Sequence, residues 1–214
     1  MTEPFLHVGR TSGGVTTLGP GRRFGIWLEG CQRACPGCLA TDLWEQRAES
    51  RVPVANLWAA VAPRLPGHDG VTISGGEPFL QAEGLLALLR CLAAAPGLDV
   101  MVYSGYHLSE LRGGVPAVRE ALGLIDLLVD GPYREDLPNT LLWRGSDNQR
   151  LRLLTPRAQR YRRFVNARYG PRRRLQFAAG ADGGLRVVGI PERGFVRGLA
   201  AGLRARGIQL EERS

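Results

Sequence analysis

Residues 30–38 read Gly-Cys-Gln-Arg-Ala-Cys-Pro-Gly-Cys and place Cys31, Cys35 and Cys38 in a C-x3-C-x2-C spacing. They directly follow a short apolar stretch, residues 24–28, which predicts a strand that runs into a loop. Soft thiolates are the usual ligands of iron–sulfur clusters, and three of them can hold three corners of a four-iron cubane. The fourth iron then has no protein ligand and is open to a small molecule. The loop is therefore predicted to bind an open-site [4Fe-4S] cluster.

Structural zinc and plain thiols are the alternatives to a cluster. Structural zinc sites use four ligands, and the fourth cysteine, Cys91, lies in an apolar segment that reads as a buried helix face. His7 and His68 do not stand at a ligand spacing. Three cysteines cannot all pair with one another as disulfides. The spacing favours the cluster and leaves zinc or free thiols as the other interpretations.

A second motif occupies residues 70–79, Gly-Val-Thr-Ile-Ser-Gly-Gly-Glu-Pro-Phe. A short β-branched strand is predicted to end in Gly75 and Gly76, and glycines allow the backbone to approach a ligand closely. Glu77 can accept hydrogen bonds from the ammonium group of a ligand. Pro78 ends the strand because it has no N–H donor. Alone this is a weak turn signal, but after the cysteine loop it predicts a ligand-binding loop.

Six stretches occur in an order and approximate spacing typical of one superfamily. They are Gly19-Pro-Gly-Arg-Arg, residues 30–38, Ser74-Gly-Gly-Glu-Pro, Tyr103-Ser-Gly-Tyr, Val129-Asp-Gly-Pro-Tyr and Trp143-Arg-Gly-Ser-Asp-Asn-Gln-Arg. Together they cover about residues 5–154. In these stretches the sequence resembles the radical S-adenosylmethionine (SAM) superfamily, and within it the activating proteins of glycyl radical enzymes, particularly of anaerobic ribonucleotide reductase.

The resemblance implies a radical SAM oxidoreductase with two cofactors, a [4Fe-4S] cluster and SAM. Cys31, Cys35 and Cys38 would be the cluster ligands. The open iron would chelate SAM, and reduction of the cluster would split SAM into methionine and a 5′-deoxyadenosyl radical that abstracts a hydrogen atom. The cofactors supply this chemistry, and the protein supplies position and shielding. The implied partners are a glycyl radical enzyme as protein substrate and a reduced flavodoxin or ferredoxin-type electron donor.

The resemblance also assigns SAM-binding residues. Residues 75–78 would line the methionine end, Ser104 would bind the ribose or carboxylate, and Asp130 would contact SAM or a bound cation. Ser104 also fits a strand-ending serine, and Asp130 also fits an ordinary Asp-Gly turn. The family often has an aromatic residue before its third cysteine, but this chain has Gly37 there. Backbone near Leu39 is therefore expected to meet the adenine.

Strands and helices are expected to alternate along the first part of the chain. The expected strands are 23–28, 71–74, 99–103, 124–129 and 151–154, and the expected helices are 54–64, 81–94, a short one near 109, and 117–122. This alternation predicts an α/β fold with a mainly parallel sheet. The resemblance selects a partial, open-sided β/α barrel of the radical SAM type, with ligand residues at the carboxyl ends of the strands. Arg144 and Asn148 are expected to close the site or to meet the partner.

The predicted domains are a radical SAM core, residues 1–154, and a basic C-terminal extension, residues 155–214. The activators that this chain resembles end soon after the motif at 143–150, so the extension departs from them. It is expected to hold a β-hairpin around a glycine-rich turn, a helix at 192–206 and an edge strand at 208–210. The extension would either complete the open side of the barrel or recognise a partner.

Charge and composition bound the choice of partners. The formal net charge is +8 with no lysine, and arginines cluster between 157 and 174. A solvated face is the default interpretation of this run, followed by docking to an acidic protein. Nucleic acid comes last because no aromatic stacking platform accompanies the arginines. No apolar run approaches the roughly 20 residues of a membrane span, and no signal peptide is expected. Reduced cysteines favour the cytoplasm.

The leading hypothesis is a radical SAM enzyme that installs a glycyl radical on a partner such as anaerobic ribonucleotide reductase. A second hypothesis keeps the radical chemistry but directs it to a peptide or small molecule in a biosynthetic or defence pathway. A third, of another class, is a non-catalytic iron–sulfur module that senses redox state and binds a partner.

Overall fold

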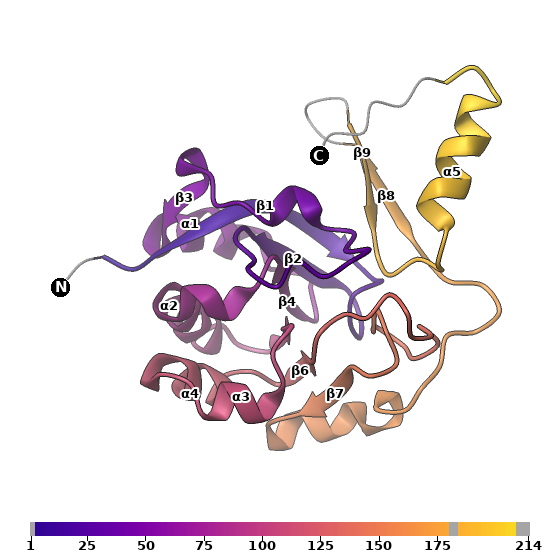
Figure 1. The fold of residues 1–214 in the computed structure, drawn as a ribbon. Coiled ribbons are helices and arrows are strands. Elements are labelled where there is room, and N and C mark those ends of the chain that lie inside the picture. The colour runs from indigo at the N-terminus through magenta and orange to yellow at the C-terminus, as the bar shows by residue number, and fades with distance from the viewer. Residues whose placement is uncertain (1–2, 180–183, 209–214) are drawn as a thin grey trace.

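The computed structural model describes residues 3–179 and 184–208, and its main feature is a mixed β-sheet (Figure 1). The strands of this sheet within those ranges are β1 (Phe5–Val15), β2 (Arg23–Leu28), β3 (Arg51–Pro53), β4 (Gly70–Gly75), β5 (Asp99–Tyr103), β6 (Leu127–Asp130) and β7 (Arg150–Leu153). Their order is β3-β1-β2-β4-β5-β6-β7. The four central strands, β2, β4, β5 and β6, are parallel, and the outer strands join them antiparallel. The predicted α/β class with a parallel centre is confirmed.

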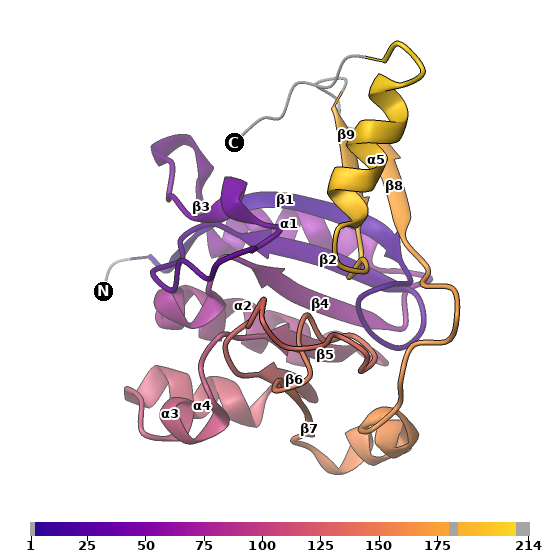
Figure 2. The same cartoon turned by 45° about the vertical axis from the view of Figure 1, so that its right-hand side comes forward.

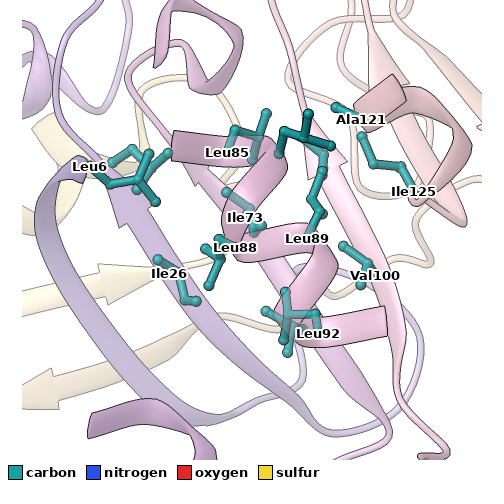
Figure 3. Packing of buried hydrophobic residues seen from close by; sticks show 14 of the residues in the cluster. Leu6, Ile26, Ile73, Leu85, Leu88, Leu89, Leu92, Val100, Ala121 and Ile125 are labelled. Atoms are coloured by element: carbon teal, nitrogen blue, oxygen red, sulfur yellow. The ribbon is translucent and has the colours of Figure 1, made fainter. Parts of the chain in front are cut away.

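Helices cover one face of this sheet. They are α1 (Val54–Val61), α2 (Ala82–Ala93), α3 (Leu108–Arg112) and α4 (Pro116–Gly123), with a 3-10 turn η3 (Ala62–Arg64) after α1. On α2, Leu88 and Leu92 lie four residues apart on one helix face. They pack against Ile26, Ile73 and Val100 of the central strands, and all five side chains are buried (Figure 3). The helical face therefore holds the main hydrophobic core.

The opposite face of the sheet holds a buried ion pair near the amino ends of the strands. Arg23 Nη1 lies 2.8 Å from Asp99 Oδ1, and both side chains are fully buried. Arg23 Nε donates to Thr72 Oγ1 at 2.6 Å. From the segment after β7, Arg160 and Tyr161 donate to Asp99 Oδ2 at 2.9 and 2.6 Å. The residues after 154 thus begin by packing against the core.

The extension contains the 3-10 helix η5 (Pro156–Phe164), the hairpin strands β8 (Gln176–Ala179) and β9 (Leu185–Val188), and the helix α5 (Phe195–Arg204). The expected hairpin is present as a separate two-stranded sheet. The helix begins at 195 rather than 192, because Gly194 takes a left-handed conformation with φ of 73°. Figures 1 and 2 show α5 beside the hairpin, on the side of the sheet away from α3 and α4. The edge strand expected at 208–210 falls mostly outside the described residues.

Two parts of the fold differ from the expectation. Strand β1 and its partner β3 were not predicted, and the strand expected at 124–129 begins only at Leu127. Before it, Leu124 caps α4, and the Asp126 carboxylate accepts the Val100 N–H at 2.9 Å. Within the described residues, no helix has both the length and the apolar character that crossing a bilayer requires.

Candidate functional site

A cavity of about 780 Å³ lies at the carboxyl ends of β2, β4 and β5. All three cysteines of the C-x3-C-x2-C motif line it, together with Gly75, Gly76, Glu77, Ser104 and Leu39. Cys91, on α2, is not among the lining residues. The volume falls in the range of about 300–1,000 Å³ that is usual for small-molecule and cofactor sites. Strand ends therefore bring the two predicted motifs to one site, as the parallel sheet led us to expect.

The cysteine loop is fixed to the fold by backbone hydrogen bonds. Gly30, with φ of +97°, turns the chain out of β2, and its N–H donates to Leu43 O at 2.9 Å. The Cys31 N–H donates to Trp44 O at 2.9 Å, and the Cys38 N–H donates to Cys35 O at 3.2 Å. Leu43 ends the short 3-10 helix η1 (Thr41–Leu43) that follows the loop. The thiols therefore project from a loop whose first residues, 30 and 31, are hydrogen-bonded to residues 43 and 44 just after it.

The donor set of the cavity fits a cubane cluster. The three thiols are free and partly exposed, and no histidine is among the residues that line the cavity. Burial raises the pKa of the Cys31 thiol, and the charge of Glu77 adds to this effect. In the part of the chain that the structure describes, no three His, Cys, Asp or Glu side chains converge as ligands of a single metal ion. A cubane places each thiolate on a different iron, so its ligands need no such convergence.

The double glycine joins the β4 loop to the cysteine loop. Gly75 has φ of +112°, and a Cβ there would lie 2.2 Å from Leu28 O. A Cβ on Gly76 would lie 2.3 Å from Gly30 O. Hydrogen bonds accompany this approach, because Gly76 N–H donates to Leu28 O at 2.8 Å and Glu77 N–H donates to Gly30 O at 2.7 Å. The glycines thus permit contact between the two loops as well as approach to a ligand.

The Glu77 carboxylate ties the ends of β4 and β5 together. It is buried, and its Oε1 accepts the Ser104 hydroxyl at 3.0 Å and the Phe79 N–H at 3.2 Å. Its Oε2 accepts the Gly105 N–H at 2.7 Å. Burial raises the pKa of Glu77, and these hydrogen bonds and the charge of Arg33 partly oppose the rise. A carboxylate offers about four acceptor positions, so one remains for a ligand.

Asp130 and Pro78 lie outside the cavity lining. Asp130 ends β6 and is buried; its Oδ2 accepts the Leu108 N–H at 2.9 Å, and its Oδ1 lies 2.8 Å from Arg152 Nε. Pro78 is the buried first residue of the 3-10 turn η4 (Pro78–Gln81). Both residues support the structure next to the cavity. Their contact with SAM stays a prediction.

The motif at 143–150 holds loops beside the cavity. Arg144 is buried and donates through Nη2 to Val165 O at 2.8 Å, and burial lowers the pKa of its guanidinium. Asn148 Nδ2 donates to Pro132 O at 2.8 Å. Gly145 and Gln149 of the same motif line the cavity. Arg144 and Asn148 therefore fix neighbouring backbone rather than face the cavity.

The Glu135 side chain, on the loop after β6, approaches the cysteine loop at Gly37. Gly37 has φ of +71°, and a Cβ there would meet the Glu135 carboxyl carbon at 2.6 Å. Tyr133 and Glu135 line the cavity on this side. Leu39, on the other side of Cys38, is 61% exposed at the rim. Glycine suits this position mainly because of its positive φ.

The extension forms a wall of the cavity, which agrees with the first of the two roles that the sequence left open for it. Residues 186–197, from β9 to the start of α5, line it. The wall is held by long-range contacts: Gln176 Oε1 accepts the Thr16 N–H at 2.7 Å, Thr17 Oγ1 donates to Val188 O at 3.1 Å, and Asn139 Nδ2 donates to Pro191 O at 3.0 Å. No motif marks these residues. Arg33 also lines the cavity, and its place between the predicted cysteine ligands was the one available signal for it.

Known proteins resemble this chain over the part that contributes the three thiols and the Gly-Gly-Glu loop. The profile of the 4Fe-4S single cluster domain family matches residues 17–152. The anaerobic ribonucleoside-triphosphate reductase-activating protein of Salmonella typhi is 36% identical over 140 residues, which are 61% of this chain and 88% of that protein. The protein of the same name from Enterobacteria phage T4 is 32% identical over 138 residues, 62% of this chain and 85% of that protein.

Among solved structures, the crystal structure of QueE from Escherichia coli overlaps 59% of this chain and 71% of that chain at 17% identity. Its TM-score is 0.42, so this overlap carries no further weight. The family profile ends at residue 152, and the extension lies beyond it.

Proposed function

The chain belongs to the radical SAM superfamily and, within it, to the family of anaerobic ribonucleoside-triphosphate reductase-activating proteins, and from that premise we propose that it installs a glycyl radical on a partner reductase. As a member of this family it is an enzyme whose cofactors are a [4Fe-4S] cluster and SAM. The target, a backbone glycine of an anaerobic ribonucleotide reductase, is the proposed part.

One observation carries the proposal: a single cavity brings three thiols together with the Gly-Gly-Glu loop. In this assignment Cys31, Cys35 and Cys38 hold the cluster. When bound, the reduced cluster and SAM supply a 5′-deoxyadenosyl radical able to remove a hydrogen atom from glycine. The protein contributes position and the exclusion of water.

The residues beside the thiols would orient SAM. Gly75 and Gly76 let the backbone of the β4 loop approach the methionine end, and Glu77 keeps an acceptor position for its ammonium group. Ser104 holds the Glu77 carboxylate in place through its hydroxyl. Backbone at Leu39 would meet the adenine at the rim.

We also propose how the chain divides into a core and an extension. We assign residues 1–154 to a radical SAM core with a partial, open β/α barrel, supported by the four parallel central strands and by the packing of α1, α2, α3 and α4 on one face of the sheet. We assign residues 155–214 to the basic extension, whose described part flanks the open side. A reduced flavodoxin or ferredoxin-type protein would donate the electron, and the cytoplasm would be its compartment.

Anaerobic reconstitution tests the function in two steps. With dithionite and SAM, the loaded protein is expected to form 5′-deoxyadenosine, and Cys35→Ala is expected to form none. With the anaerobic ribonucleotide reductase of the same genome added, a glycine-centred doublet is expected in electron paramagnetic resonance. 5′-Deoxyadenosine without a doublet would direct the chemistry to another peptide or small molecule. No 5′-deoxyadenosine at all would leave the redox-sensing interpretation.

A further inference from the structure

The positive charge of this chain lies in its extension. Residues 1–154 contain 14 arginines and 16 acidic residues, a net charge of −2. Residues 155–214 contain 14 arginines and four acidic residues, a net charge of +10. The +8 of the whole chain is therefore an excess on the extension over a slightly acidic core.

Part of this charge is neutralised inside the molecule. Arg157 Nε lies 2.6 Å from Asp126 Oδ1, and Arg160 Nη2 lies 2.9 Å from Asp99 Oδ2. Both carboxylates are fully buried. Burial alone would raise the pKa of Asp126, but the hydrogen bonds from Arg157 and Thr155 lower it overall. The default interpretation of the 157–174 run as a solvated face therefore needs correction for these two arginines.

Other arginines of the extension face the cavity. Arg193 and Arg197 line it, one before and one inside the first turn of α5, and both are exposed. Neither forms an ion pair with another residue of the described ranges. Their charges lie at the mouth of the cavity that holds the three thiols, where Glu135 and Glu192 also line it and Glu192 is paired with Arg173.

Apolar side chains accompany these arginines. Val196, between them, is 44% exposed, and Leu39 of the cysteine loop is 61% exposed. Both line the same cavity. We name Leu39, Arg193, Val196 and Arg197 the rim. The rim combines two unpaired cations from the extension with apolar surface from both the extension and the cysteine loop.

We propose that the rim docks an acidic polypeptide segment of the partner protein and guides it to the cavity. The inference rests on the proposed function for the identity of that partner. Acidic side chains on the segment would pair with Arg193 and Arg197, while an apolar residue between them would cover Leu39 and Val196. Complementary charge mainly raises the association rate and fixes orientation. The four rim residues include no aromatic side chain on which bases stack, but Phe195 and Tyr133 line the cavity beside them, so nucleic acid is one of the outcomes that the test distinguishes.

The test uses the cluster-loaded full-length protein under anaerobic conditions and two labelled probes. One is a glutamate-rich peptide with a central Leu-Gly-Val, and the other has glutamine in place of every glutamate. The rim variant is Arg193→Glu/Arg197→Glu. The matched control is Arg162→Glu/Arg163→Glu, which makes the same charge change at exposed positions of η5. Figures 1 and 2 show η5, the orange helix after β7, at the opposite end of the molecule from α5.

Fluorescence anisotropy is expected to show tighter binding of the glutamate peptide to the unmodified protein. The rim variant should weaken this binding roughly tenfold at low salt, and the control variant should change it by less than about twofold, since steering depends on where the charges lie. Added salt should reduce the difference in affinity between the unmodified protein and the rim variant, because exposed charges are screened.

Equal weakening by both variants would show that diffuse charge suffices and would overturn the proposal, as would no weakening by either. A single-stranded oligonucleotide of equal charge is the third probe. If it binds at least as tightly as the peptide and loses affinity in the rim variant, the rim is a nucleic-acid site instead. The proposed function is tested separately, on the unmodified protein, by formation of 5′-deoxyadenosine and of the glycine-centred doublet on the reductase. If the peptide binds at the rim but no glycyl radical forms on the reductase, the proposed function is wrong and the docking role of the rim is kept.

Discussion

Gly76→Ala is the sharpest test of how the two motif loops depend on each other. A Cβ at this position would lie 2.3 Å from Gly30 O, 2.7 Å from Gly30 C and 3.0 Å from Leu43 O. All three atoms belong to the backbone, so no side chain can rotate away. The clash can be relieved only if Gly30 moves, and Gly30 immediately precedes Cys31.

Gly76→Ala is expected to lower the free energy of unfolding through two contributions. Overpacking a close contact costs about 1–3 kcal/mol. Moving Gly30 also breaks the 2.7 Å hydrogen bond from Glu77 N–H to Gly30 O, and a typical hydrogen bond is worth about 0.5–1.5 kcal/mol. We therefore expect a loss of about 2–4 kcal/mol from the free energy of unfolding, out of the roughly 5–15 kcal/mol of an ordinary domain. The displaced Cys31 should also lower the capacity for iron.

Two measurements check this expectation. Urea denaturation of the cluster-free protein gives the free energy of unfolding, and iron content after anaerobic reconstitution gives cluster occupancy. Gly123→Ala is the matched control, because no atom lies within 4 Å of its added Cβ at the end of α4. It should leave iron content unchanged and alter stability by at most about 1 kcal/mol, in the stabilising direction expected of alanine in a helix. If Gly76→Ala retained full iron content and the stability of the control, the inferred contact between the loops would be wrong.

Three further changes have distinct expected outcomes. Asp99→Asn leaves the buried Arg23 guanidinium without its counter-charge, and should lower the free energy of unfolding in urea by about 3–5 kcal/mol; a loss below 1 kcal/mol would contradict this. Asp126 is buried, which raises its pKa, but hydrogen bonds from an arginine and a threonine lower it overall. The stability that Asp126 contributes is therefore present at neutral pH and lost on acidification below the ordinary aspartate range of about 4. Asp126→Asn should make the free energy of unfolding depend less on pH in this acid range, and an unchanged dependence would count against the assignment. Cys91→Ala should retain full iron content whereas Cys35→Ala should not, and iron loss in the former would place a ligand on α2.

The central strands could be predicted because they are buried on both faces. Such strands read as continuous apolar runs, and the structure has β2 and β5 at the expected residues 23–28 and 99–103. Strand β1 lacks this signal, since it is mostly half-buried and contains Gly9, Gly13 and Gly14. Gly9 is a packing requirement, because a Cβ there would meet the Leu43 side chain at 2.4 Å. Glycine in a strand pattern usually signals a break, and here it conceals a strand.

The residues on the floor of the site could be predicted from the sequence, whereas the residues of its wall could not, although the extension was one candidate for that place. Motifs that end parallel strands must meet at one edge of the sheet, so the grouping of Cys31, Gly75 and Ser104 was predictable. The wall depends on contacts between distant segments, such as Gln176 with Thr16. A polar side chain that accepts one backbone hydrogen bond leaves no local pattern in the sequence. The pairing of Arg160 with Asp99 and of Arg157 with Asp126 could not be predicted for the same reason.

The extension contacts the core near both the amino and the carboxyl ends of the strands. These contacts limit which experiments can reveal its role. Near the amino ends of the strands, η5 supplies Arg157 and Arg160 to two buried carboxylates. Near the carboxyl ends, β9 and the start of α5 form the cavity wall. Removing residues 155–214 would therefore take Thr155 and Arg157 away from the Asp126 carboxylate and would open the cavity at the same time. Loss of activity in such a truncation would report instability as readily as loss of docking. Charge reversal at the rim leaves both anchors intact, so only this change isolates recognition from folding.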